Sequence, residues 1–372
     1  MSAQADEIRQ AVRRYAAEQL APHAARWDRE KEFPRDALKG LAEMGLYGVA
    51  IPEEWGGAGM DYTSLAVACE EISAGDCATA TIVAVNNLVA GILNGYASAA
   101  QKTKFLKPLA QGKMLGAFAL TEPQVGSDAS AITTRAERKG NEYVLNGVKQ
   151  FITSGKNADI AVVFAVTDKA AGKKGISAFV VPTSTPGYIV ARIEEKAGQH
   201  ASDTAQIVFE NCRTEHLLGQ EGAGYRIALA NLESGRINVA AQATGVARAA
   251  LEAAIAYTRE RKSMGKTLIE HQAVNFRLAD MATQIEAARQ LYLHAARLRD
   301  AGQPCLKEAS MAKLFASEMA EKVCSDAIQV HGGYGYVSDF PVERFWRDVR
   351  VTKIYEGAND IQRMVIGREL EQ

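Results

Sequence analysis

The chain has 372 residues, of which 47% are hydrophobic and 23% are charged, and its formal net charge at pH 7 is −1. A chain of this length accommodates about two to three domains, and the composition is that of an ordinary globular protein. The near-neutral charge gives no electrostatic argument for a nucleic-acid partner or for binding to a membrane surface.

The sequence carries few signs of export, membrane insertion or metal binding. No apolar run approaches the roughly 20 residues of a transmembrane helix, so we predict no membrane span. Residues 1–9 have neither the apolar core of a secretion signal nor the acid-poor composition of a transit peptide. The five cysteines lack CxxC spacing and the six histidines include no HxxxH pair, so neither a disulfide framework nor a metal site is expected. We expect a reduced, cytoplasmic protein of bacterial type, with a mature mitochondrial-matrix form as the alternative.

Helical periodicity marks the first part of the chain, residues 1–115. Apolar side chains recur at near-helical spacing at Ile8, Val12 and Tyr15. A stretch rich in Pro and Gly at residues 51–59 interrupts this pattern and predicts a structured loop.

Short β-prone runs separated by turn residues replace the helical pattern in residues 116–225. Examples are residues 160–166 and 205–209, which are rich in Val, Ile and Phe. Residues 226–372 are again helical, with long amphipathic faces and many alanines that suit close helix packing. Because strands and helices do not alternate, we predict an α+β protein with a β domain between two helical domains.

Two glycine-containing stretches resemble nucleotide-binding motifs only in part. Residues 222–227 begin like the dinucleotide fingerprint, but Ile227 stands where a third small residue is needed and no βαβ unit surrounds it. Residues 265–267 resemble the end of a phosphate-binding loop, but Glu260 occupies the position of its first glycine. Neither stretch predicts a loop of these two types.

The segment from 341 to 363 carries a carboxylate, Glu356, between the apolar step Ile354–Tyr355 and Gly357. A carboxylate that follows buried residues and lies in an apolar setting has a raised pKa, which lets it act as a base near neutral pH. Gly357 lets another backbone or a ligand approach closely, because it has no Cβ. From these residues alone, an exposed turn is the alternative interpretation and the more common one for charged residues.

Further landmarks follow one another in the order of a known family. They are IPEEWGGAG (51–59), FALTEPQVGSD (118–128), KQFITSG (149–155), SDT (202–204), RKSMGK (261–266) with HQ (271–272), QVHGGYGY (329–336) and IYEGANDIQR (354–363). In these segments the chain resembles the acyl-CoA dehydrogenase family over nearly its full length. The resemblance implies an N-terminal α-helical domain (1–115), a middle β-barrel domain (116–225) and a C-terminal four-helix bundle (226–372).

The resemblance also implies FAD as the cofactor, held between the β domain and the C-terminal helices. Backbone N–H groups and hydroxyls of residues 118–127 suit the edge of a flat ring or the oxygens of a pyrophosphate. The family pattern assigns the flavin contacts of this domain to Phe118, Leu120, Thr121, Ser127, Phe151 and Thr153. Phe151, where many members have Trp, is expected to cover one ring face, and Thr153 to hydrogen-bond near the reactive nitrogen.

A neighbouring subunit is expected to close the cofactor site, so the resemblance implies a homotetramer built as a dimer of dimers. The positions that reach the cofactor at this interface are Arg261, Met264, Gln272, Gln329, Gly332 and Gly333. An arginine suits a diphosphate because its guanidinium makes two charge-assisted hydrogen bonds. Met264 replaces a Phe that is common in the family. Ala358 and Asp360 stand where many members have Thr and Gln, which weakens these two flavin contacts.

The reaction implied by the resemblance is the α,β-dehydrogenation of an acyl-CoA to the trans-2-enoyl-CoA. Glu356 is expected to take the α-proton, while its own N–H and a flavin ribityl hydroxyl stabilise the enolate oxygen. The hydride passes to flavin N5, and the electrons then leave to an electron-transfer flavoprotein. The expected substrate contacts are Ser127, Glu233, Arg236 and Gly357. Some members place the base on an earlier helix, where this chain has Gly235, so Glu356 is expected to be the single base.

The acyl chain is expected to be short or short and branched. Segments 81–93, 234–242 and 307–313 are similar to members with such substrates. Ala80 stands where glutaryl-type members place an Arg, which disfavours a dicarboxylate. Hydrophobic pockets discriminate by only about 1–3 kcal/mol per methylene, so several chain lengths are expected to be accepted. Fatty-acid β-oxidation and branched-chain amino-acid degradation both stay open as the pathway.

Two other functions are compatible with the family pattern. An acyl-CoA oxidase would pass its electrons to oxygen, and the short C-terminal block disfavours the larger oxidases. A homologue recruited only to hold flavin, for example in binding nucleic acid, would show a basic surface and a lost base. The near-neutral charge and the presence of Glu356 speak against this second function.

Overall fold

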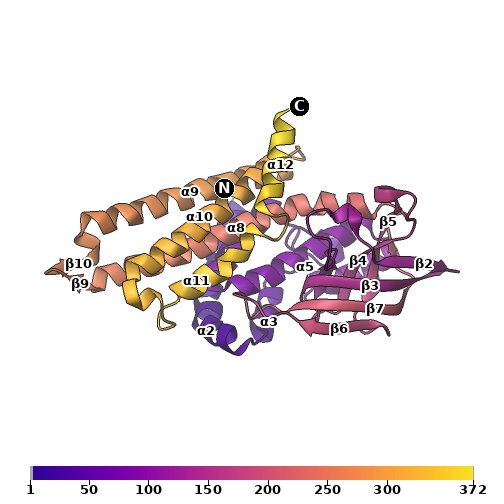
Figure 1. Ribbon diagram of the computed structural model, residues 1–372, viewed down its shortest axis with the longest axis horizontal. Coiled ribbons are helices and arrows are strands. Elements are labelled where there is room, and N and C mark those ends of the chain that lie inside the picture. The colour runs from indigo at the N-terminus through magenta and orange to yellow at the C-terminus, as the bar shows by residue number, and fades with distance from the viewer. Residues whose placement is uncertain (1–2, 372) are drawn as a thin grey trace.

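The computed structural model describes residues 3–371 and shows helices, then strands, then helices along the chain (Figure 1). The two helical blocks form one elongated body, and the strands lie at one end of it, on the right in Figure 1. The predicted α+β class, with a β region between two helical regions, is confirmed. The domain boundaries at residues 115 and 225 remain a prediction.

The first helical block precedes the strands and packs around an apolar core. Its α-helices are α1 (Ala3–Tyr15), α2 (Ala21–Glu30), α3 (Arg35–Glu43), α4 (Tyr62–Gly75), α5 (Cys77–Tyr96), α6 (Ala99–Gln101) and α7 (Lys107–Ala110). Aspartates cap the two central helices. Asp61 accepts a hydrogen bond from the Ser64 N–H at 2.7 Å, and Asp76 accepts one from the Thr79 N–H at 2.7 Å. The predicted loop at residues 51–59 lies between α3 and α4.

Helix α5 corrects one expectation from the sequence. Within residues 3–371 it is the one helix that is long and apolar enough to cross a membrane by length and composition, so the expectation that no apolar run approaches this length is wrong. In the fold, 78% of its most apolar window is buried. Helix α5 packs against α4, α8 and β1, and its apolar length is explained by burial on several sides.

The strands form one eight-stranded sheet. They are β1 (Gly116–Ala119), β2 (Arg135–Lys139), β3 (Glu142–Thr153), β4 (Ile160–Val166), β5 (Ile176–Pro182), β6 (Tyr188–Ile193), β7 (Thr204–Thr214) and β8 (Leu217–Leu218). Their order is β6-β7-β3-β2-β4-β5-β8, and β1 pairs in parallel with β4 beside this path. In the described part of the chain the two edge strands, β6 and β8, do not pair with each other, so the expected barrel is open between them.

The second helical block follows the sheet. Its helices are α8 (Gly224–Glu260), α9 (Gln272–Asp300), α10 (Leu306–His331), α11 (Val342–Val349) and α12 (Asn359–Leu370). Helices α8, α9 and α10 pack side by side along the long axis of the molecule (Figure 1). The short α11 and α12 both pack on α10, so the expected bundle has three long helices and two short ones. A hairpin of β9 (Lys262–Ser263) and β10 (Lys266–Thr267) joins α8 to α9 at the end far from the sheet (Figure 1).

Helix α8 connects the sheet to both helical blocks. Its 37 residues span about 55 Å at 1.5 Å per residue. It begins against β5, where a Cβ on Gly224 would lie 2.6 Å from the Ser177 carbonyl carbon. Farther along, it packs against α4, α5, α9 and α10. The first third of α8 therefore lies where sheet and helices meet.

Candidate functional site

A cavity of about 50 Å³ lies where α5, α8, the end of β3 and the loop before α12 meet. It is lined by Thr81, Ala84, Val85 and Leu88 of α5, by Gly235, Asn238, Val239 and Gln242 of α8, and by Thr153, Tyr355 and Glu356. The lining positions on each helix are three, four and seven apart, which places them on one helix face. Among these described lining residues Glu356 is the one acid, and none carries a positive charge.

Glu356 presents a carboxylate oxygen that is shielded from solvent. The residue as a whole is half-buried, but its Oε2 is inaccessible and has no hydrogen-bond partner within residues 3–371. Burial raises the pKa of Glu356 to about 7, and the positive charges of Arg236 and Lys313 limit this rise. The backbone of Glu356 has a φ of 53°, in the left-handed region that non-glycine residues seldom adopt. Such a carboxylate can accept a proton near neutral pH.

Gly235 leaves free the space that this carboxylate occupies. A Cβ built on Gly235 would lie 2.3 Å from Oε2 and 2.8 Å from Cδ of Glu356. A larger side chain at this position of α8 would push the carboxylate aside. The fold thus brings together positions 235 and 356, the two positions that the sequence resemblance gave as alternatives for the base.

Lys313 of α10 holds the loop that carries Glu356. Its side chain is fully buried. Its Nζ donates to the Gly357 carbonyl oxygen at 2.9 Å and to Asn359 Oδ1 at 2.8 Å. Burial lowers the pKa of Lys313 to about 7, although the charge of Glu356 opposes this shift. This lysine was not identified from the sequence. Its position among alanines on an apolar helix face was the one sign that it is buried.

Buried hydrogen bonds fix a polar wall of the cavity. The Tyr355 hydroxyl donates to Gln242 Oε1 at 2.6 Å. Gln242 Nε2 donates to Thr81 Oγ1 at 2.6 Å and to the Cys77 carbonyl oxygen at 3.0 Å. Thr81 Oγ1 in turn donates to Gln199 Oε1 at 2.7 Å. Burial raises the pKa of Tyr355 far above its ordinary value, so its hydroxyl remains a donor.

Two expectations about apolar positions need correction. Ile354 is 56% exposed, so the burial of Glu356 does not come from this residue. Ala80 is fully buried but is not among the residues that line the cavity. Its neighbour Thr81 faces the cavity instead, because adjacent residues of a helix with 3.6 residues per turn point about 100° apart.

The predicted flavin contacts around β1 lie on the strand and on the loop that follows it. Phe118 is half-buried, with its ring centroid 5.1 Å from that of Phe164. Leu120 is buried, Thr121 is half-buried and Ser127 is exposed. These residues therefore present backbone and short polar groups rather than charges.

Of the two predicted flavin contacts on β3, one lines the cavity and the other is exposed. Thr153 lines it together with Glu356. Phe151, two residues earlier, is 61% exposed and has a φ of 59°. An aromatic ring that is exposed on a strained backbone is a frequent mark of a functional site. Because Phe151 offers a flat, exposed apolar surface two residues before the cavity-lining Thr153, the residues of this strand end fit the ring of FAD.

A buried ion pair fixes the loop after β1. Lys149 Nζ lies 2.9 Å from Glu122 Oε1 and donates to the Leu120 carbonyl oxygen at 2.9 Å. Glu122 also accepts hydrogen bonds from the N–H groups of Thr133 at 2.7 Å and Thr134 at 2.9 Å. Burial acts to raise the pKa of Glu122, but Lys149 and the hydrogen-bond donors outweigh it and lower the pKa to about 2. This pair was not predicted from the sequence.

The cofactor contacts predicted at the subunit interface lie at the opposite end of the helical body, near β9 and β10 (Figure 1). They are Arg261, Met264, Gln272, Gln329, Gly332 and Gly333, and all are exposed. Arg261 comes 26 residues after Gly235, which is about 39 Å at the helical rise of 1.5 Å per residue. One protomer therefore does not bring these residues to the cavity.

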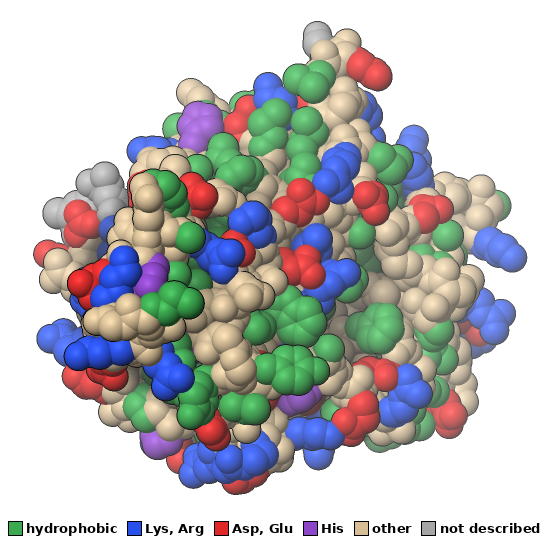
Figure 2. Space-filling model, turned by 60° about the vertical axis from the view of Figure 1, so that its left-hand side comes forward, with side chains coloured by type: hydrophobic (Ala, Val, Ile, Leu, Met, Phe, Trp, Pro, Cys, Tyr) green, Lys and Arg blue, Asp and Glu red, His purple; other side chains and the backbone are tan. Residues whose placement is uncertain are grey.

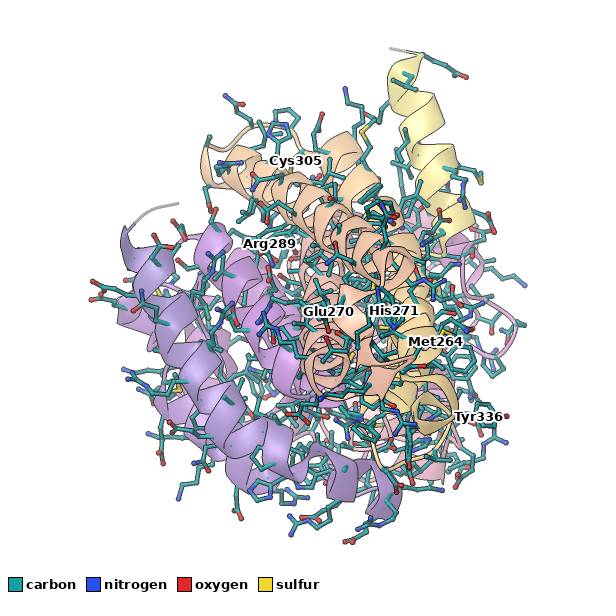
Figure 3. The ribbon with its side chains drawn as sticks, turned by 90° about the vertical axis from the view of Figure 1, so that its left-hand side faces the viewer. Met264, Glu270, His271, Arg289, Cys305 and Tyr336 are labelled. Carbon is teal, nitrogen blue, oxygen red and sulfur yellow. The ribbon has the colours of Figure 1, made fainter. Side chains whose placement is uncertain are left out.

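Large hydrophobic side chains are exposed at this far end. Met264 is 93% and Tyr336 is 87% exposed, and Phe276 at the start of α9 is 59% exposed. Figure 3 looks onto this end and shows Met264 and Tyr336 on the same side of it. Figure 2 shows hydrophobic side chains interspersed with charged ones on the adjoining face. Exposed apolar groups of this kind are typical of a surface that another protein covers.

The predicted substrate contacts on α8 differ in their surroundings. Arg236 is buried, and its Nη1 donates to Ser310 Oγ at 3.2 Å. Glu233 is half-buried and accepts a hydrogen bond from Arg299 Nη1 at 3.2 Å. Arg236 thus lies near enough to Glu356 to influence its pKa, whereas Glu233 pairs with α9.

The residues just after Glu356 begin helix α12. Gly357 has a φ of 87°, which suits a glycine. Ala358 is half-buried, and its carbonyl oxygen accepts the Gln362 N–H at 3.1 Å. Asp360 is exposed and lies 3.3 Å from Arg363. Neither Ala358 nor Asp360 lines the cavity.

The cysteines form no disulfide, and the possible metal ligands form no cluster, within residues 3–371. All five cysteines are free and buried. Within residues 3–371 no group of three or more His, Cys, Asp or Glu side chains is arranged to hold a metal ion.

Comparison with known families accounts for almost the whole chain. Residues 2–113 match the acyl-CoA dehydrogenase N-terminal domain, residues 117–212 its middle domain and residues 222–371 its C-terminal domain. The chain belongs to the acyl-CoA dehydrogenase family. This assignment confirms the three-domain fold and the predicted class, a flavin-dependent oxidoreductase of the acyl-CoA dehydrogenase type.

Curated relatives are similar over their full length. An acyl-CoA dehydrogenase of Bacillus subtilis (strain 168) is 47% identical over 366 residues, which cover 98% of this chain and 97% of that protein. The short-chain specific acyl-CoA dehydrogenase of Rattus norvegicus mitochondria is 46% identical over 366 residues, which cover 98% of this chain and 89% of that protein.

Solved structures have the same fold. Butyryl-CoA dehydrogenase from Megasphaera elsdenii superposes with a TM-score of 0.98 at 40% identity and covers 100% of this chain and 99% of that one. A chain from the work on the electron transferring flavoprotein of Acidaminococcus fermentans superposes with a TM-score of 0.98 at 45% identity, covering 100% and 98%. A glutaryl-CoA dehydrogenase from Mycobacterium smegmatis in complex with FADH2 has a TM-score of 0.94 at 31% identity, covering 100% and 95%.

Proposed function

We propose that this protein dehydrogenates a short- or short-branched-chain acyl-CoA to the trans-2-enoyl-CoA, with Glu356 as the base. The observation that carries the proposal is the state of the Glu356 carboxylate. It lines a small cavity, its Oε2 is shielded and unpaired within residues 3–371, and its pKa is raised to about 7. A thioester α-proton is a weak acid, and its removal needs a desolvated base with a pKa near the working pH.

The residues around Glu356 support proton transfer. At a pKa of about 7, a useful fraction of the carboxylate is ionised at neutral pH. Arg236 and Lys313 keep this fraction from falling further, because their positive charges favour the ionised form. The backbone N–H of Glu356 makes no hydrogen bond within residues 3–371. This donor is available to the thioester oxygen, where it would stabilise developing negative charge.

FAD is the cofactor in this proposal, and when bound it supplies the acceptor of the β-hydride at N5. Phe118, Leu120, Thr121, Ser127, Phe151 and Thr153 would hold its ring region. The exposed ring of Phe151 supports this assignment, because it lies two residues before Thr153, which lines the same cavity as Glu356.

The size and the lining of the cavity support a short acyl chain. The cavity is small, about 50 Å³, and Ala84, Val85, Leu88 and Val239 give it an apolar side that suits a short hydrocarbon chain. The absence of cationic side chains among its described lining residues disfavours a dicarboxylate. Similarity to the short-chain and butyryl-CoA enzymes points in the same direction.

The proposed assembly is a homotetramer, a dimer of dimers in which two subunits share each cofactor site. It is supported by the distance of about 39 Å along α8 between the cavity and Arg261, at 1.5 Å per residue, and by the exposed apolar groups near Met264. The proposed electron acceptor is an electron-transfer flavoprotein, in line with the similar chain from the work on the electron transferring flavoprotein of Acidaminococcus fermentans. A cytoplasmic location belongs to the same proposal.

An anaerobic titration of the purified FAD-loaded protein tests the reaction. The ligands are butyryl-, isobutyryl-, 2-methylbutyryl-, octanoyl- and glutaryl-CoA, and the signal is the loss of oxidised-flavin absorbance. We expect bleaching with one or more of the short thioesters in the wild type and none with Glu356→Gln. A flavin that no thioester bleaches would overturn the proposed reaction.

The electron acceptor and the assembly are tested separately. Rapid reoxidation of the reduced protein by air, rather than by an electron-transfer flavoprotein, would identify an oxidase instead. A stable, active and FAD-loaded monomer in light scattering would contradict the shared cofactor site.

A further inference from the structure

The side chain of Asn238 is an unusual component of the acyl cavity. It lies on α8 and is only 2% exposed, and it lines the cavity together with Gly235 and Glu356. Its Nδ2 faces the Tyr62 hydroxyl at 3.4 Å, whereas its Oδ1 has no hydrogen-bond partner within residues 3–371. A buried amide oxygen without a donor is unfavourable, so native structures rarely keep one without a reason.

The other amide of this wall is fully engaged. Gln242 lies one turn beyond Asn238 on the same face of α8. Its Oε1 accepts the Tyr355 hydroxyl, and its Nε2 donates to Thr81 Oγ1 and the Cys77 carbonyl oxygen. Among the described lining residues, the unpartnered buried polar atoms are therefore Asn238 Oδ1 and Glu356 Oε2.

The position of Asn238 along α8 relates its free acceptor to the substrate. Gly235 contacts the Glu356 carboxylate, which marks the place of the substrate α-carbon in the proposed function. Asn238 follows Gly235 by three residues, or about 4.5 Å along the helix axis, and shares its face. Three bonds of an extended chain span roughly 3.5 Å. A hydroxyl on the γ-carbon, whose oxygen is three bonds from the α-carbon, would thus come close to Asn238.

We propose that Asn238 forms a polar subsite in the acyl pocket, which selects short acyl thioesters with a hydroxyl on the γ-carbon. This inference rests on the proposed function and narrows its substrate class. A γ-hydroxyl donates to Oδ1, whereas the methyl end of a plain chain leaves Oδ1 unpaired. The chemistry is unchanged: the α-proton goes to Glu356, the β-hydride goes to bound FAD, and the γ-hydroxyl is retained in the 4-hydroxy-2-enoyl-CoA product.

Steady-state assays with butyryl-CoA and 4-hydroxybutyryl-CoA test the subsite. The measured quantity is the ratio of kcat/KM for the hydroxylated substrate to kcat/KM for the plain one. We expect Asn238→Leu to lower this ratio roughly five- to tenfold, because it removes one neutral hydrogen bond. Asn238→Ala provides the same comparison if the leucine variant does not fold.

Asn231→Leu is the matched control. Asn231 is a buried asparagine two turns earlier on α8, its Nδ2 donates to the Ile227 carbonyl oxygen at 2.8 Å, and it does not line the cavity. We expect this variant to keep the wild-type ratio.

The outcomes separate the subsite from the proposed reaction. If the wild type oxidises butyryl-CoA and the ratio is the same in Asn238→Leu, the subsite is wrong while the reaction stands; an ordered water on Oδ1 would give this result. If the wild type oxidises neither of these two thioesters, the subsite is wrong; if in addition no thioester of the flavin titration bleaches the flavin, the proposed function itself fails.

Discussion

Glu122 and Glu356 are both shielded carboxylates near a buried lysine, yet their pKa values move in opposite directions. Glu122 forms an ion pair with Lys149 at 2.9 Å and accepts backbone N–H groups, and its pKa falls to about 2. Lys313 instead directs its Nζ to Gly357 and Asn359. The Oε2 of Glu356 is left without a partner within residues 3–371, and the pKa of this acid rises to about 7.

The contrast shows that the placement of donors, rather than burial alone, decides what a buried acid does. A complete set of donors stabilises the ionised form, so Glu122 holds a loop in place and does not exchange its proton at neutral pH. A carboxylate without donors is less stable when ionised and is ready to gain a proton. We therefore expect substitutions of Glu122 to change stability and substitutions of Glu356 to change rate.

Glu356→Gln is expected to have the largest effect on rate. The rate of anaerobic flavin reduction by butyryl-CoA should fall about 10²–10⁴-fold, because an amide cannot take the α-proton. The free energy of unfolding should not fall, since Oε2 has no hydrogen bond to lose and the neutral amide removes a buried charge. Stopped-flow absorbance and urea unfolding measure the two quantities. A variant that keeps its rate and loses stability would remove the distinction between the two acids.

Glu122→Gln is expected to have the largest effect on stability. It leaves Lys149 buried without its partner and should lower the free energy of unfolding by roughly 3–5 kcal/mol. The double variant Glu122→Gln with Lys149→Met should be less destabilised than the single one, because no unpaired charge remains. Urea unfolding of the FAD-loaded proteins measures both. Equal losses in the single and double variants would show that the ion pair is not the cause.

Gly235→Ala is expected to slow the reaction without unfolding the protein. The added Cβ would lie 2.3 Å from Glu356 Oε2, so the carboxylate must move. A displacement of about 1 Å at a reacting group reduces a rate by up to about 10²-fold. Gly367→Ala is the control, since a Cβ there meets no atom within 4 Å. Equal rates in the two variants would contradict the contact between Gly235 and the base.

Lys313→Met is expected to move the pH dependence of the reaction. In the wild type, kcat/KM should rise with pH and level off above the Glu356 pKa of about 7, because only the ionised base accepts a proton. Removing the positive charge of Lys313 raises this pKa, so the midpoint should move to higher pH. Lys307→Met on the same helix is the control, because Lys307 is partly exposed and its one ion pair within residues 3–371 is with Glu308 at 3.5 Å. A midpoint that stays at the wild-type pH would exclude Lys313 as a charge that tunes the base.

The smallest expected effect concerns stability as a function of pH. The pKa of Glu356 is raised from 4.5 to about 7, so the folded state binds this proton more tightly than the unfolded state. Its contribution to stability is fully present below pH 4.5 and is lost as the pH rises through about 7. Glu356→Gln should be less sensitive to pH over this range than the wild type in thermal unfolding. A parallel pH dependence in both proteins would contradict the raised pKa.

The sequence predicted the order of the three domains and the family, because these depend on local patterns and on motifs in register. It also singled out the acid Glu356, whose role as the base stays a prediction. It did not predict Lys313, Asn238 or the Gln242 network, because their roles arise only when α5, α8, α10 and the loop before α12 pack together. The two mistaken positions have local causes. Ile354 is apolar but lies exposed, and Ala80 differs from the cavity-lining Thr81 by one step around the helix.

The contact between Gly235 and Glu356 also limits how such an enzyme can change over time. A Cβ at position 235 and the carboxylate of Glu356 cannot occupy their present places together. A glutamate cannot therefore be added at position 235 while the Glu356 carboxylate stays where it is. A lineage that moves its base from the loop to α8 must pass through an ancestor with a displaced carboxylate or with none. Such ancestors are poor catalysts, so each lineage is expected to keep whichever base position it first acquired.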